Sequence, residues 1–127
     1  MTTLFFIGRL LLGGFFVWSG IQHFTGLKGY TGYAKFKKLP MPRESVIVSG
    51  IMLLLGGCGI ILGTNVKLSI FVLSIFLVIT NFTMHTFWKE KDASARTQDQ
   101  IGFNKNLALL GALLMMLMIP MPWLLAL

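Results

Sequence analysis

Four long apolar runs limit what this chain can fold into. They cover about residues 4–23, 45–63, 68–88 and 104–125. The hydrocarbon core of a bilayer is about 30 Å thick, and a helix needs about 20 residues to cross it. Each run is close to that length, and a helix satisfies its own backbone hydrogen bonds in lipid. The sequence therefore predicts an all-α protein, an integral membrane four-helix bundle with up-down topology that forms one transmembrane domain over residues 1–127.

The composition favours a membrane protein and argues against a nucleic-acid-binding one. Of the 127 residues, 55% are hydrophobic and 12% are charged, which is too apolar for the surface of a soluble domain of this size. The net charge of +7 could indicate nucleic-acid binding. However, the basic residues flank the apolar runs in short loops and form no basic face. We therefore expect membrane lipid around the chain and no nucleic-acid partner.

Lysine and arginine gather in two of the three connections. These connections are about residues 24–44 and 89–103, whereas the turn at 64–67 carries only Lys67. By the positive-inside rule, both long loops lie in the cytoplasm and both termini lie outside. The aromatic residues and lysines of the first connection fit a short interfacial helix, and a solvated loop is the alternative.

Motifs for independent catalysis are missing from the sequence. Cys58 is the one cysteine, so an internal disulfide and a self-contained dithiol mechanism are excluded. There is no nucleotide-binding glycine motif, no H-E-x-x-H and no nucleophile elbow. We therefore expect no metal site and no self-sufficient enzyme, and whether the chain serves an enzyme as a subunit stays open.

Polar residues should gather at one end of the bundle. In an up-down bundle, the ends of the first and third runs lie at the same depth as the start of the fourth. The candidate ligand-binding residues near this depth are His23, Asn81, His85, Trp88, Asn104 and Asn106. The two histidines could hydrogen-bond a quinone carbonyl, with Trp88 against the ring. A packing role for His85, bonded to Asn81 or to an amide of the fourth run, is the simpler alternative. Two lone histidines do not favour a haem site.

Arg9 is the seventh candidate and lies apart from the others. It lies about 21 Å from His23 along an ideal helix, which rises 1.5 Å per residue. Since no apolar run has a carboxylate in its interior, Arg9 needs another partner. The candidates are backbone carbonyls or lipid phosphate, the terminal carboxylate of Leu127, and an anionic ligand, of which the first pair is the simplest.

Steps of three and four residues predict which stripe of each run faces the bundle interior, where small and polar residues are favoured. The predicted stripes are Arg9, Gly13, Phe16, Gly20 and His23; Ser49, Met52, Gly56, Gly59 and Gly63; Ser74, Val78, Asn81, His85 and Trp88; and Asn104, Ala108, Gly111, Met115 and Met118.

The segments GRLLLGGFFVWSGIQHF, SGIMLLLGGCGIILG and FNKNLALLGALL, with the histidine-bearing end of the third run, resemble the DoxX (DoxX/DoxD-like) family of small bacterial and archaeal membrane proteins. An arginine in the first run, a Gly-x-x-His at its end and a Phe-x-Lys-Asn start of the fourth run carry most of the resemblance. Many relatives have a carboxylate early in the second run, where this chain reads VIVSGIM. The resemblance implies a four-helix membrane bundle in the cytoplasmic membrane of a prokaryotic cell.

The resemblance also implies a function. Some relatives look like membrane subunits of thiosulfate:quinone oxidoreductases, and others are associated with oxidative-stress and sulfur-transfer proteins. By this resemblance, the chain is an accessory subunit in membrane redox or sulfur and oxidative-stress chemistry. It would contact quinone, its partner would be a soluble redox or sulfur-transfer protein, and a homo-oligomer is a candidate assembly. The alternative is a non-catalytic membrane scaffold, or a lipid- or small-anion-binding protein, without redox activity.

Overall fold

Five α-helices and one short 3-10 turn make up the part of the chain that the computed structural model describes, residues 1–123. In chain order they are α1 (Thr2–Thr25), α2 (Leu27–Phe36), α3 (Pro42–Leu62), α4 (Val66–Thr83), the 3-10 turn η1 (Phe87–Lys89) and α5 (Ala93–Met116). The predicted all-α class is therefore confirmed. α2 is a short helix within the first basic connection, as the interfacial-helix interpretation expected.

Three helical segments are long and apolar enough to cross a membrane. They are Thr2–Thr25, Pro42–Leu62 and Val66–Lys89, and they correspond to the first three predicted runs. The helix near the fourth run differs from the prediction, because α5 begins and ends about eleven and nine residues earlier than the predicted 104–125. Residues 124 and 125 of that predicted run lie outside the described residues.

The early start and end of α5 have local causes that hydropathy does not detect. The carboxylate of Asp92 accepts a hydrogen bond from the backbone N–H of Ala95 at 3.0 Å, which caps the helix within a polar segment. Beyond Met116, two prolines at positions 120 and 122 exclude a regular helix. The helix therefore combines a polar first half with an apolar second half.

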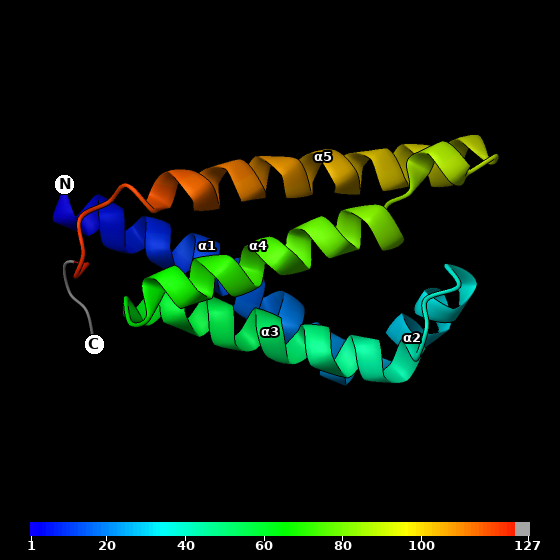
Figure 1. The fold of residues 1–127 in the computed structure, drawn as a ribbon, viewed down its shortest axis with the longest axis horizontal. Coiled ribbons are helices and arrows are strands. Elements are labelled where there is room, and N and C mark those ends of the chain that lie inside the picture. The colour runs from blue at the N-terminus through cyan, green and yellow to red at the C-terminus, as the bar shows by residue number, and fades with distance from the viewer. Residues whose placement is uncertain (124–127) are drawn as a thin grey trace.

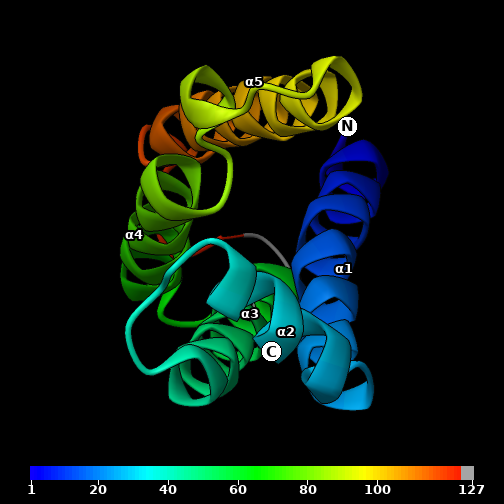
Figure 2. The ribbon, with the colours of Figure 1, turned by 90° about the vertical axis from the view of Figure 1, so that its right-hand side faces the viewer.

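The long helices run alternately up and down (Figure 1). The chain starts at the end opposite to α2 and η1, and the described C-terminal segment returns to that starting end. α1 packs on α3, α3 on α4, and α4 on α5. α1 and α5 lie on adjacent sides of the bundle without direct helix-to-helix packing along their described lengths (Figure 2). The bundle is thus an open series of helices, α1–α3–α4–α5.

Glycines allow α1 and α3 to meet at their backbones. A Cβ atom at Gly13 would lie 2.7 Å from the carbonyl oxygen of Gly57, and a Cβ at Gly57 would lie 2.8 Å from the carbonyl oxygen of Gly13. A side chain at either position would therefore separate the helices, as at other small-residue contacts in membranes. Four residues of the interior stripe predicted for the first run, Arg9, Gly13, Phe16 and Gly20, are buried, and His23 at its end is half-buried.

The stripes predicted for the other helices need correction. On α3, Gly56, Gly59 and Gly63 are buried as predicted. Ser49 and Met52 are only half-buried, and Leu53 is buried in place of Met52. On α4 the buried residues are Val66, Ser69, Ile70, Leu73, Leu77 and Asn81. Leu73 faces inward because it fills the space next to Gly56. A Cβ atom at Gly56 would lie 2.5 Å from the Cγ of Leu73. On α5 the buried residues are Asp99, Gly102, Asn106 and Leu113, none of them in the predicted stripe.

Two adjacent glycines test the backbone contact of α1. We expect Gly13→Ala to lower the free energy of unfolding by about 1–3 kcal/mol, because the new methyl group meets backbone atoms that cannot move aside. Gly14→Ala is the matched control, since no atom lies within 4 Å of a Cβ there. It should leave stability unchanged or raise it by up to about 1 kcal/mol. Thermal unfolding in mild detergent measures both, and equal melting temperatures would contradict the proposed contact.

Candidate functional site

A cavity of about 770 Å³ lies among the helices in the half of the bundle nearer α2. Core side chains such as Phe16, Leu53 and Leu77 form part of its wall, and the lining is mostly apolar. The polar residues in the lining are Ser19, His23, Tyr30, Tyr33, Glu44, Ser45, Ser49, Thr80, Thr83, His85, Lys105 and Asn106. A mostly apolar space of this size with a few polar groups is typical of a small-molecule site.

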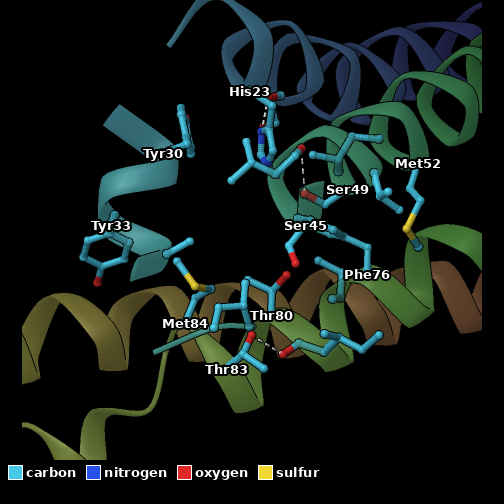
Figure 3. Close-up of a pocket in the computed structure, with 18 of the residues that line it drawn as sticks. His23, Tyr30, Tyr33, Ser45, Ser49, Met52, Phe76, Thr80, Thr83 and Met84 are labelled. Carbon is cyan, nitrogen blue, oxygen red and sulfur yellow. Dashed lines mark hydrogen bonds between the residues drawn. The ribbon is translucent and has the colours of Figure 1, made fainter. Parts of the chain in front are cut away.

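Several polar side chains converge in the cavity from different helices. His23, Ser45, Ser49 and Thr80 point toward one another from α1, α3 and α4, and Thr83 lies one turn farther along α4 (Figure 3). These side chains lie near the ends of their helices, at the depth where α2 crosses the bundle. The cavity is therefore polar mainly on the side of α2 and apolar toward the middle of the bundle.

His23 is held firmly in the wall of the cavity. Its Nδ1 lies 2.8 Å from the carbonyl oxygen of Ser19, one turn earlier in α1. The imidazole also stacks on the ring of Tyr30, with 4.7 Å between centroids, and meets the edge of Phe76. Tyr30 reaches it because the chain turns at Gly26 and enters α2 directly after α1. The ring of His23 is thus fixed by one hydrogen bond and two aromatic contacts.

A buried ionic cluster joins α2 to the segment around α5. The ammonium of Lys37 lies 2.7 Å from Glu90 Oε1 and 2.5 Å from Asp99 Oδ2. The hydroxyl of Tyr33 donates to Asp99 Oδ1 at 3.2 Å. The side chains of Lys37 and Asp99 are only 5% and 6% exposed. Because α2 and α5 do not pack on each other along their described lengths, this cluster is what connects them.

His85 lies between the cavity and the ionic cluster. Its Nδ1 is 3.9 Å from Asp99 Oδ1 and has no hydrogen-bond partner within residues 1–123. Its ring lies against Gly102, where a Cβ would come within 2.6 Å of it. The expected bond from His85 to Asn81 is not found. The Asn81 amide nitrogen donates to the carbonyl oxygen of Phe103 at 3.2 Å, and Asn81 Oδ1 has no hydrogen-bond partner within residues 1–123. Asn81 therefore ties α4 to α5, and His85 faces Asp99.

The structure brings together only part of the predicted polar cluster. His23, His85 and Asn106 line the same cavity, whereas Asn81, Trp88 and Asn104 do not. Trp88 is 47% exposed and packs against three phenylalanine rings, because α4 ends before it and the chain turns into η1. Asn104 lies on the exposed side of α5. Trp88 leaves the predicted cluster because α4 does not continue to it, whereas Asn104 lies within α5 but on its exposed face. These placements correct the prediction.

Arg9 lies at the opposite end of the bundle and caps α3. It is 2% exposed, and its guanidinium donates to the carbonyl oxygens of Ile60 at 3.2 Å and Ile61 at 2.7 Å. The last carbonyls of a helix have no partner within it. The rings of Phe5, Phe6 and Trp123 surround the cation at 5.3–5.8 Å. Backbone carbonyls are thus partners of Arg9, and the predicted alternative, the carboxylate of Leu127, lies outside the described residues.

The sequence analysis missed Tyr30 and the ionic cluster. Tyr30 and Tyr33 lie in a connection that was interpreted as headgroup-facing, and Lys37 was counted only as a topology signal. One signal was available for Asp99. It lies on the same helical face as Asn106, which follows seven residues later. It would have required a helix that starts well before the apolar run.

Removing the cation of the cluster should destabilise the fold. We expect Lys37→Met to lower the free energy of unfolding by about 3–5 kcal/mol, because Asp99 would keep a buried charge without its partner. Lys35→Met, at an exposed position of the same helix, is the control and should change it by no more than about 0.5 kcal/mol. Denaturation in mild detergent measures both variants. Equal stability of the two would mean that the cluster does not hold α2 in place.

The same cluster predicts a loss of stability at alkaline pH. Burial disfavours the charge on Lys37, but its hydrogen bonds to Asp99 and Glu90 outweigh that effect and raise its pKa above 10.5. Burial also raises the pKa of Tyr33, and Asp99 raises it further. A group whose pKa is higher in the folded state stabilises the fold below its unfolded pKa, and this stabilisation is lost as the pH rises through the folded pKa. The melting temperature should therefore fall more steeply above about pH 10 in the native chain than in Lys37→Met.

Comparison with known proteins agrees with this architecture. The model of the DoxX family matches residues 4–86, which include α1, α2, α3 and α4. None of the curated proteins and none of the solved structures matches the chain. The family match covers more than half of the 127 residues and coincides with the membrane-spanning helices. This multi-pass membrane protein therefore belongs to the DoxX family.

Proposed function

We propose that this DoxX-family protein binds a quinone-type carrier, a planar ring with a lipid-soluble tail, in the cavity between its helices. In this role it is an accessory subunit of a membrane redox system in sulfur or oxidative-stress chemistry. The observation that carries the proposal is the cavity itself. It has about 770 Å³ of mostly apolar space, and its polar groups gather at the end where a ring headgroup would lie.

The wall of the cavity suits a planar ring. His23 and Tyr30 are already stacked, and Phe76 meets His23 edge-on at 6.3 Å. Aromatic faces at this spacing give both contact area and a preferred orientation for another ring. The polar side chains next to them supply the few directed contacts that such sites use for orientation.

The seam between α1 and α5 offers a path for an apolar tail. These helices do not pack on each other along their described lengths, and side chains alone bridge them. The ammonium of Lys105 lies 5.3 Å above the ring of Phe15, and both residues line the cavity. Since Phe15 is 40% exposed, the cavity reaches the lipid-facing surface beside it. A tail leaving there would enter the hydrocarbon of the membrane.

The proposed orientation places α2 and η1 on the cytoplasmic side. Lys28, Lys35 and Lys38 are exposed on or next to α2, at the same end as η1. This bias follows the positive-inside rule, and such lysines also attract anionic lipid headgroups. A soluble redox or sulfur-transfer partner would then dock at this face. An electron donor of that kind is needed because the proposed role is that of a subunit and not of a self-sufficient enzyme.

Filling the cavity should remove the bound carrier. The native chain, purified in mild detergent, should carry isoprenoid quinone in its organic extract, measured by mass spectrometry and absorbance. We expect Ser49→Trp, which projects an indole into the cavity, to reduce this quinone roughly tenfold or more per chain. Ile51→Trp is the control, because Ile51 is 45% exposed on the same helix and does not line the cavity.

The two variants should melt at similar temperatures, which shows that the fold is intact. Phospholipid without quinone, present equally in the native chain and in both variants, would overturn the redox proposal. The chain would then be a lipid-binding or scaffold protein.

A further inference from the structure

The hydrogen bond of His23 decides which of its nitrogens can serve a ligand. A carbonyl oxygen only accepts hydrogen bonds, so the 2.8 Å contact with Ser19 requires Nδ1 to carry the proton. In the neutral ring, Nε2 is then a lone-pair acceptor. Stacking on Tyr30 and the edge contact with Phe76 hold the ring in this orientation. His23 therefore offers an acceptor and no donor.

Three hydroxyl groups in the lining, like His23, can only accept a hydrogen bond from a ligand. Ser45 donates to the carbonyl oxygen of Pro40 at 3.0 Å, and Ser49 donates to that of Val46 at 3.1 Å. Thr83 donates at 2.7 Å to a carbonyl of its own helix, one turn earlier. A hydroxyl has one hydrogen and two lone pairs, so each of these groups has already used its donor within the protein. What remains for a ligand is their ability to accept.

The acidic side of the lining adds to this pattern. The hydroxyl of Tyr33 donates to Asp99, and Glu44 contributes a carboxylate, which only accepts. The hydroxyls of Tyr30 and Thr80 can act either way. Lys105 supplies the cationic donor, but it lies on the α5 wall above Phe15. At the end of the cavity formed by α1, α3 and α4, the groups left to accept are those of His23, Ser45, Ser49 and Thr83. The donors of Lys105 and Asn106 belong to the α5 wall.

We propose that this cavity prefers a ring headgroup that carries hydroxyl groups, the reduced quinol or another phenol, over the oxidised quinone. A phenolic O–H can donate to Nε2 of His23, whereas a quinone carbonyl presents only lone pairs to it. A buried site arranged for a ligand hydroxyl rejects the analogue without it, because its polar groups are left unpaired. This inference rests on the proposed function and specifies the redox form that the site holds.

Three probes with the same ring size test whether the cavity prefers a ligand hydroxyl over a ligand carbonyl. Naphthol carries the hydroxyl, methoxynaphthalene has it blocked, and naphthoquinone has carbonyls instead. We expect the full chain in lipid nanodiscs to bind naphthol roughly tenfold or more tightly than either of the others, measured by titration calorimetry. Naphthoquinone binding as tightly as naphthol, or more tightly, would overturn this inference and leave the quinone-site proposal standing. No binding of any of the three probes would overturn both.

Two variants test whether His23 and Thr83 are responsible for the preference for naphthol. His23→Phe keeps an aromatic ring beside Tyr30 but removes Nε2, so naphthol affinity should fall to that of methoxynaphthalene. Thr83→Val keeps the shape of its side chain but removes an acceptor, and it should weaken naphthol binding several-fold with little effect on methoxynaphthalene. The Thr83 variant also serves if His23→Phe fails to fold. An unchanged preference for naphthol in the folded variants would overturn the assignment to this wall.

Discussion

The backbone contact between α1 and α3 determines how the remaining helices are arranged. Gly13 and Gly57 let the two helices approach until each carbonyl lies where the other residue's side chain would be. α4 then covers the other side of α3, and α5 covers α4, which leaves α1 and α5 without direct helix packing along their described lengths. Because this series does not close tightly, the space enclosed by its helices remains as a cavity. The glycine contact thus causes both the tight side and the open side of the bundle.

The same contact explains how much of the helix packing the sequence could predict. Gly13 and Gly20 lie at helical steps from Arg9 and Phe16, so the packing face of α1 followed from this spacing. A glycine alone is not enough, since no atom lies within 4 Å of a Cβ at Gly14. The stripe of α4 did not, because leucine and valine suit lipid and protein interior equally and give no signal of direction. Leu73 faces inward only because α3 has Gly56 opposite to it. A partner on another helix therefore decides the phase of α4, and a single run cannot reveal it.

Depth in the bundle predicted the site better than helical phase did. His23 comes from α1, His85 from the segment after α4 and Asn106 from α5, and up-down order was enough to bring them to one cavity. Trp88 was misplaced because α4 ends at Thr83, and no apolar pattern marks that end. The pairing of Lys37 with Asp99 joins two polar connections whose residues are 62 positions apart. No local pattern encodes such a pair, because only the completed fold brings α2 above the start of α5.

The polar groups of the cavity are arranged so that the space is stable before a ligand enters. A buried donor without a partner is costly, whereas a carbonyl or hydroxyl oxygen with one unused lone pair is better tolerated. Ser45, Ser49 and Thr83 each use their hydrogen on a backbone carbonyl, so they leave no donor exposed to apolar surroundings. At the ends of the bundle, Arg9 and Lys37 direct their donors to carbonyls and carboxylates instead. An incoming hydroxyl therefore gains a bond at this wall without breaking one that holds the protein together.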